Sequence, residues 1–223
     1  MPELPEVETI VRDLRPVLVG RRIERAALSH ADVLRGVTRR TLLATLPHRT
    51  IGALSRRAKH AVFDLGDRRL VVQPGMTGAL LTYDRALTPA ERRYAVLQLA
   101  LDDGRLLVYR DVRRLGTLLL LDDRRWAAYD SALGPEPLAA DFTALALHRA
   151  LQGSRAAVKK VLMDQRHVVG IGNIYANEAL FAARIDPSRS ARQLTLDDAT
   201  RLHTEVRRIL TAAIVFQGTT FRD

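Results

Sequence analysis

The first residues of the chain could supply a nucleophile and an acid. Pro2 follows the initiator methionine, and removal of Met1 would expose the proline amine. A terminal amine has a reference pKa of about 8 against about 10.4 for lysine, so more of it is unprotonated at neutral pH. A secondary amine that attacks a sugar carbon gives a cationic iminium, which is an electron sink. Glu3 would stand beside it as a general acid, with Glu6 one helical turn further on.

The same residues have a simpler structural interpretation. Proline and acidic residues are typical of the first turn of a helix, because of the fixed φ of proline and the helix dipole. Taken alone, residues 2–6 favour this interpretation. The chemical one also requires removal of Met1, since the Pro2 nitrogen is otherwise an amide and cannot act as a nucleophile.

The basic residues point to a polyanion partner. Lysine and arginine number 35 against 25 acidic residues, which gives a formal net charge of +10. Such a surplus favours nucleic acid, although a merely solvated charged surface is the alternative. Only Lys59, Lys159 and Lys160 are lysines. Since lysine can give up a proton and arginine effectively cannot, a retained lysine is a candidate for chemistry.

A glycine-containing turn precedes a predicted helix at residue 173. Gly170 and Gly172 would leave backbone N–H groups free at the positive end of the helix dipole. That arrangement is a ready phosphate site. A purely structural corner between two helices is the alternative.

Two predicted loops carry residues that could enter a DNA stack. Residues 73–78 form a tight turn that presents Met76, and residues 111–116 form a basic corner with Arg113 and Leu115. Apolar side chains can wedge between bases while a cation holds a phosphate or a base. The alternative is that Met76 and Leu115 fill the core.

Composition excludes several classes of protein. The 223 residues suit two modest domains or one large one, and 47% are hydrophobic, enough for a core. We expect no membrane span and no signal peptide, because the chain has neither a long uncharged apolar stretch nor a basic start. The sequence holds no cysteine, which excludes disulfides and thiolate metal sites within it and fits a cytoplasmic location.

The elements expected to position these residues begin with a helix and short strands. Apolar residues recur at helical spacing from Val7 to Leu18, and Pro16 is expected to end or kink this helix. Strands are predicted at 60–65, 70–73, 94–101, 105–109 and 116–121. Their close spacing predicts a sandwich or a barrel rather than alternating strands and helices.

The second half is predicted to be helical. After a turn-rich break at 133–137, helices are expected at 142–152, 155–166, 173–184 and 196–215. The last has the clearest signature, with Thr195 and Asp198 as a capping box. We therefore predict an α+β fold with a catalytic β domain over residues 1–130 and an all-α domain over residues 131–223.

Six segments together resemble, in order, the landmarks of the formamidopyrimidine-DNA glycosylase/endonuclease VIII family. They are residues 1–9, 57–60, 74–78, 111–116, 164–178 and 217–223. The resemblance spans the whole chain and lies closer to the formamidopyrimidine branch. It implies a β-sandwich domain with flanking helices, a DNA-binding helix–two-turn–helix domain, and damaged duplex DNA as the partner of a monomer in the bacterial cytoplasm.

The resemblance implies bifunctional base excision of oxidised purines, with Pro2, Glu3, Glu6 and Lys59 as catalytic residues. Pro2 would attack C1′ of a flipped nucleotide, and β- and δ-elimination would follow. Met76, Arg113 and Leu115 would fill the space left by that nucleotide. Further DNA contacts are expected from Tyr94, Arg155, Lys159, Asn173 and Tyr175, and lesion-pocket contacts from Glu178, Thr219, Thr220 and Arg222.

The chain departs from the family pattern in four places. Gln73 and Tyr94 stand where histidines are expected, and Leu115 stands where guanine-lesion enzymes often have phenylalanine. Leu115 therefore leaves an oxidised-pyrimidine glycosylase as an alternative, and a non-catalytic DNA-binding relative is a separate one. The fourth departure is the absence of the family's four-cysteine zinc finger, so no metal or cofactor is expected. The chain could be truncated, incomplete in its sequence or naturally without zinc, and loss of the tail would weaken DNA binding and impair excision.

Overall fold

The computed structural model describes residues 2–217, which form two compact units. One unit comprises Pro2 and Ile10–Ala128, and the other comprises Glu3–Thr9 and residues 129–217. The first helix, α1 (Leu4–Leu18), therefore begins in one unit and continues in the other. The domain bounds of 1–130 and 131–223 stay a prediction.

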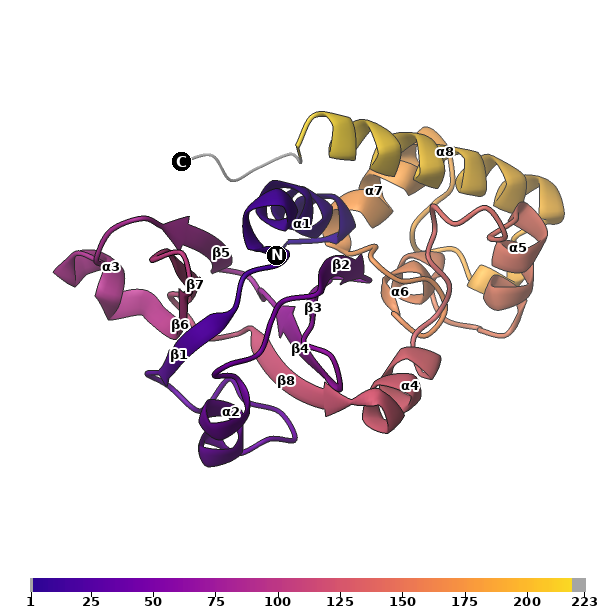
Figure 1. Ribbon diagram of the computed structural model, residues 1–223. Coiled ribbons are helices and arrows are strands. Elements are labelled where there is room, and N and C mark those ends of the chain that lie inside the picture. The colour runs from indigo at the N-terminus through magenta and orange to yellow at the C-terminus, as the bar shows by residue number, and fades with distance from the viewer. Residues whose placement is uncertain (1, 218–223) are drawn as a thin grey trace. The chain divides into compact units, whose positions relative to one another are not determined.

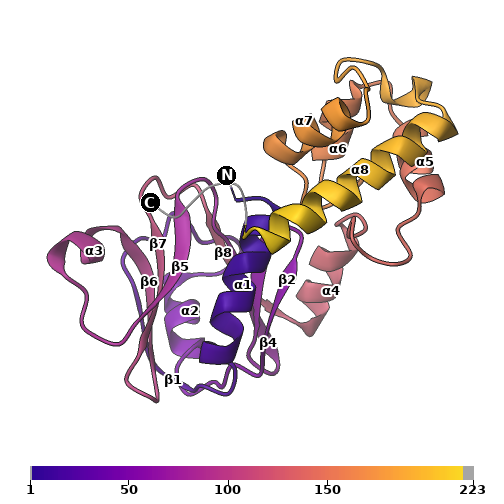
Figure 2. The same cartoon turned by 90° about the horizontal axis from the view of Figure 1, so that it is seen from above.

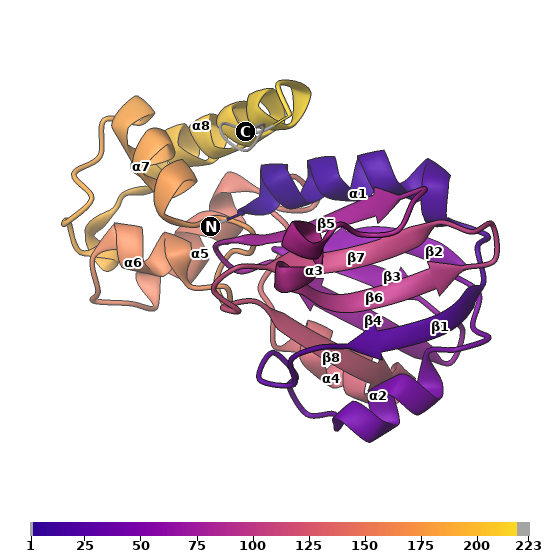
Figure 3. The same ribbon diagram turned by 90° about the vertical axis from the view of Figure 1, so that its left-hand side faces the viewer.

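The first unit is a sandwich of two antiparallel sheets, seen as two layers in Figure 3. The first sheet has the order β1-β6-β7-β5, formed by Ile23–Leu28, Ala95–Leu101, Leu106–Asp111 and Gly78–Tyr83. The second has the order β2-β3-β4-β8, formed by Ala53–Arg57, His60–Asp64, Arg68–Gln73 and Thr117–Asp122. The predicted sandwich is confirmed, and Gly66 takes the positive φ that its hairpin turn requires.

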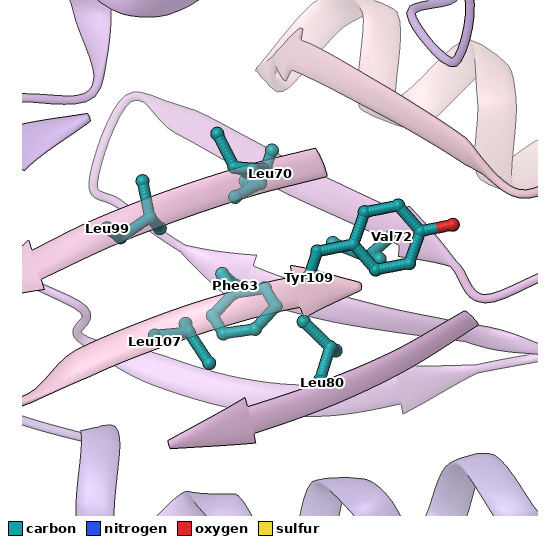
Figure 4. A pocket seen from close by; sticks show the side chains of 8 residues that line it. Phe63, Leu70, Val72, Leu80, Leu99, Leu107 and Tyr109 are labelled. Carbon is teal, nitrogen blue, oxygen red and sulfur yellow. The ribbon is translucent and has the colours of Figure 1, made fainter. Parts of the chain in front are cut away.

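The core of the sandwich lies between the two sheets. A cavity of about 10 Å³ remains there, lined by the apolar side chains that Figure 4 shows. A space this small and apolar fits no ligand, so it is a packing gap. The residues around it are Phe63, Leu70, Val72, Leu80, Leu97, Leu99, Leu107 and Tyr109.

Three short helices accompany the sheets and were not predicted: α2 (Arg39–Thr45), α3 (Pro89–Tyr94) and α4 (Asp123–Ser131). None of the residues of α3 and α4 is buried, so neither helix has the apolar face that periodicity detects. The predicted strand at 94–101 is wrong at its first residue. Tyr94 ends α3, and β6 begins at Ala95.

Pro16 lies inside the last turn of α1, and the helix continues to Leu18. Of the two predicted outcomes, an end of the helix at Pro16 is wrong, and a kink at Pro16 stays a prediction. The side chains of Val11, Leu14 and Leu18 are buried, and their burial offsets the one backbone hydrogen bond that proline removes.

The second unit is helical (Figures 1 and 2). It contains α5 (Ala144–Gln152), α6 (Val158–Met163), α7 (Asn173–Ala182), the 3₁₀ turn Ala191–Gln193 and α8 (Leu196–Val215). The long helix α8 packs against both α5 and α7. Its capping box, Thr195 with Asp198, is confirmed. None of the helices between residues 2 and 217 combines the length and apolar character that a bilayer crossing requires.

Candidate functional site

The carboxylate of Glu3 caps the start of helix α7. Its Oε1 accepts the Ile174 N–H at 2.9 Å, and its Oε2 accepts the Gly172 N–H in a short bond. Gly172 has no side chain of its own to satisfy these amides, so an acid from the far end of the sequence does so. Glu3 is only 2% exposed. Its position is therefore fixed by backbone atoms.

Glu6 holds Glu3 in place from the first turn of α1. Its Oε2 accepts the Glu3 N–H at 2.9 Å, and its Oε1 accepts the Tyr175 hydroxyl at 2.6 Å. All three side chains are buried. Tyr175 was expected at the DNA surface, and the structure places it inside the helical unit as a partner of Glu6.

The turn before α7 is built around Gly170 and Gln165. The Leu4 N–H donates to the Gly170 carbonyl at 3.0 Å, and the Gly170 N–H donates to Gln165 Oε1 at 2.8 Å. The amide of Gln165 also donates to the Ile171 carbonyl at 3.0 Å. Beside this turn, the Arg166 guanidinium lowers the pKa of Asp164 to about 2. The turn thus fixes the chain that presents the α7 amides to Glu3.

Replacing Gly170 with alanine should strain this turn. Gly170 has a φ of +82°, and a Cβ there would lie 2.6 Å from Leu4 Cδ1. We expect Gly170→Ala to lower the free energy of unfolding by about 1 to 3 kcal/mol in a urea titration.

A matched control is Gly153→Ala at the end of α5. Gly153 has a φ of −71°, and its Cβ would lie 3.8 Å from the nearest atom, the Ala150 carbonyl oxygen. That substitution should be neutral or stabilise by up to about 1 kcal/mol. Equal stability of the two variants would contradict this account of the turn.

Lys59 lies in the two-residue turn between β2 and β3, which the paired residues Arg57 and His60 flank. Ala58 adopts a φ of +55° there and is fully buried, as Lys59 nearly is at 5% exposure. A left-handed conformation in a residue other than glycine costs free energy, and such strain is common beside functional residues. The turn gives Lys59 a restricted position.

The two loops predicted to enter DNA belong to the sandwich unit, and their candidate residues are at its surface. Met76 is 43% exposed and Leu115 is 55% exposed, so neither fills the core. Arg113, which lies between them in the sequence, is also exposed. The structure therefore favours the surface interpretation of these three residues over the packing one.

The other predicted DNA and lesion contacts are spread over both units. Tyr94 is half-buried, and the guanidinium groups of Arg93 and Arg110 lie 5.5 and 6.0 Å from its ring centre. Asn173 and Glu178 are exposed on α7, as is Arg155 before α6, and Lys159 is partly exposed on α6. Thr219, Thr220 and Arg222 lie outside the described residues.

Within the described part of the chain, His, Asp and Glu side chains nowhere gather in a group of three or more that could bind a metal. The zinc finger implied by the resemblance cannot form from this sequence, because its 223 residues include no cysteine.

Comparison with protein families identifies both units of the chain. Residues 1–118 match the formamidopyrimidine-DNA glycosylase N-terminal domain, and residues 133–223 match the formamidopyrimidine-DNA glycosylase H2TH domain. The chain belongs to the formamidopyrimidine-DNA glycosylase family. The predicted membership and the predicted helix–two-turn–helix region are therefore confirmed.

Curated formamidopyrimidine-DNA glycosylases match along the whole chain. The protein of Chloroflexus aurantiacus is 42% identical over 224 residues, and that of Halorhodospira halophila is 44% identical over 225 residues. The matches cover all of this chain and 80% and 82% of those relatives.

Solved structures of the family have the same fold. Lactococcus lactis Fpg bound non-covalently to DNA with an abasic site matches with a TM-score of 0.89 at 31% identity, covering 97% of this chain and 83% of that one. Thermus thermophilus MutM (Fpg) matches with a TM-score of 0.85 at 38% identity, covering 100% and 79%.

Sequence reasoning missed two residues of the glycosylase that the structure brings forward. Gln165 was quoted only as part of a motif, although its side chain ties the turn before α7. Asp111 was treated as the start of a basic corner, although it is buried and bonded to two loops. A buried acid at a strand end can be suspected from sequence, but its partners cannot be read there.

Proposed function

We propose that this family member is a bifunctional DNA glycosylase and AP lyase that excises oxidised purines, 8-oxoguanine and formamidopyrimidines, from duplex DNA. The observation that best supports the proposal is the buried Glu3 carboxylate, held by the amides of Gly172 and Ile174 directly after Pro2. An acid fixed beside a potential amine nucleophile suits reactions at a sugar carbon.

The proposed reaction begins when the Pro2 nitrogen, freed of Met1, attacks C1′ of a nucleotide flipped out of the duplex. The new N–C1′ bond forms, and the glycosidic bond breaks with its electron pair on the leaving base. Glu3 takes up the proton that the Pro2 nitrogen loses and delivers it to the ring oxygen as the C1′–O4′ bond breaks and the iminium forms, and the leaving base takes a proton from water. Loss of a C2′ proton then expels the 3′ phosphate, and a second elimination expels the 5′ phosphate.

The remaining roles are those that the family resemblance implies for each side chain. Lys59 neutralises a phosphate beside the lesion and assists elimination, and Asn173 contacts that phosphate from the turn at α7. Met76, Arg113 and Leu115 fill the space of the flipped nucleotide, with Arg113 facing the base opposite. Glu178 and Lys159 contact lesion and phosphate. With damaged duplex DNA as its partner, we place the enzyme in the bacterial cytoplasm as a monomer.

Borohydride trapping on a panel of lesions tests the proposal. Protein whose intact mass shows loss of Met1 is mixed with duplexes that carry 8-oxoguanine, a formamidopyrimidine, an oxidised pyrimidine or no lesion. We expect a covalent adduct with both purine lesions at rates at least about tenfold above the pyrimidine lesion, since pocket contacts commonly discriminate by 10-fold or more.

Two other outcomes would replace the proposal. Faster trapping on the oxidised pyrimidine would identify an endonuclease VIII-like specificity. Absence of any adduct, with damage-dependent retardation of the same duplexes in a gel, would identify a non-catalytic binder.

A further inference from the structure

Asp111 joins the two loops that carry the exposed residues Met76, Arg113 and Leu115. It is the last residue of β7 and is 1% exposed. Its Oδ1 accepts the Thr77 hydroxyl at 2.5 Å and the Arg113 N–H at 3.3 Å. Its Oδ2 accepts the Tyr109 hydroxyl at 3.0 Å and the Gly116 N–H at 2.9 Å. One carboxylate thus accepts four donors from three segments.

The two loops also touch each other directly. The Arg113 N–H lies 3.1 Å from Thr77 Oγ1, which links the loops a second time. A Cβ on Gly75 would lie 2.5 Å from the Gly116 nitrogen, and a Cβ on Gly116 would lie 1.9 Å from the Tyr109 hydroxyl. The backbones of the two loops are therefore in contact at both glycines, in addition to the hydrogen bonds that Asp111 accepts.

The side chains that Asp111 does not hold point to the surface. Met76 neighbours Thr77, and Arg113 and Leu115 flank the segment whose amides Asp111 accepts. Burial, and then the charge of Asp111, raise the pKa of Tyr109, so its phenol remains a donor to the carboxylate throughout the working pH range. We call the Asp111 carboxylate and its four hydrogen-bond donors the clamp. The carboxylate is buried, and the edge beside it is exposed, apolar at Met76 and Leu115 and cationic at Arg113.

Fold stability alone is a poor explanation for this carboxylate. Burying a charge is costly even when it is fully hydrogen-bonded, and an apolar side chain of similar size often gives equal stability. A carboxylate with four fixed donors instead specifies one geometry of the two loops.

We propose that Asp111 is a positioning residue that fixes Met76, Arg113 and Leu115 as one rigid edge, and that this edge is needed to open duplex DNA at the lesion. The inference rests on the proposed function and extends it, because it names the residue that makes three separate side chains act together.

The test compares Asp111→Asn with the parent on two substrates. The amide keeps the shape of the side chain, but its NH₂ group would face partners that are themselves hydrogen-bond donors. On duplexes with 8-oxoguanine, where a nucleotide must be flipped and its space filled, we expect the excision rate to fall by about 10- to 100-fold. On a single-stranded oligonucleotide with a preformed abasic site, which has no stack to fill, we expect strand cleavage within about twofold of the parent.

Two further variants sharpen the comparison. Asp122→Asn makes the same chemical change at the end of β8, where the carboxylate caps the Arg125 N–H, and should leave both rates unchanged. Thr77→Val removes one arm of the clamp while leaving the Asp111 carboxylate in place, and should reproduce a smaller duplex-specific loss. It also serves as the test if Asp111→Asn fails to fold, as judged by thermal unfolding.

The outcomes are distinct. Parent-like duplex excision by a folded Asp111→Asn, or by Thr77→Val where Asp111→Asn does not fold, overturns the proposal. So does an equal loss on duplex and single strand, which would indicate a general structural role. A parent enzyme that cleaves neither substrate overturns the proposed function itself.

Discussion

A form of this protein whose Pro2 nitrogen stays in a peptide bond should give no covalent adduct with damaged DNA. An amide nitrogen has no available lone pair, so the first bond of the proposed mechanism cannot form. We expect nicking of an 8-oxoguanine duplex to fall at least about a thousandfold, as is common when a nucleophile is removed. The measurement uses a chain with an N-terminal extension, assayed before and after a protease cut that leaves Pro2 first.

Pro2→Gly is the matched variant, because glycine after Met1 also allows methionine removal and retains a terminal amine. Its primary amine can form an imine, so trapping should be slower but present. Gel retardation of the extended form should equal that of the cut form if only chemistry is lost. An extended chain that nicks damaged duplexes at the rate of the cut chain would show that Pro2 is not the nucleophile.

Glu3→Gln should separate base excision from strand cleavage. The amide fits the same place but has one acceptor atom for the two N–H groups of Gly172 and Ile174, and it carries no transferable proton. We expect excision of 8-oxoguanine to slow by about 10²- to 10⁴-fold, the range typical of a lost general acid. Cleavage at a preformed abasic site should fall much less, since part of that sugar is already open.

The control for Glu3→Gln is Glu205→Gln on α8, where the carboxylate pairs with Arg208 at the surface and should not affect either rate. Glu6→Gln gives a second comparison, because Glu6 acts on Glu3 and Tyr175 through hydrogen bonds. An equal effect of Glu3→Gln on excision and on abasic-site cleavage would argue against an acid that works at ring opening.

Local patterns predicted the parts of this fold that depend on neighbouring residues. The Gly66 hairpin, the turn before Asn173 and the Thr195 cap each follow from a few adjacent side chains, and all are present. The helices α3 and α4 have no buried side chain, so no periodic signal marked them. The fate of Pro16 depended on burial of α1, which spacing alone does not measure.

For the candidate site, the sequence predicted a set of residues but not their geometry. Residues 1–9 and 164–178 carried the resemblance, whereas the bonds between them join positions about 170 apart in sequence. The clamp at Asp111 was hidden for the same reason, because its partner Thr77 lies 34 positions away on another segment. Residue types indicate which chemistry is possible, and only the fold shows which side chains are in contact.

The hydrogen bonds of Glu3 to the α7 amides can form only late in synthesis of the chain. Those amides belong to residues 172 and 174, so the ribosome must add some 170 residues after Glu3 before they exist, which takes on the order of ten seconds or more. During that interval the leading end of the nascent polypeptide has no partner to cover it. Removal of Met1, which the proposed mechanism requires, has this interval to take place before Glu3 can bind the α7 amides.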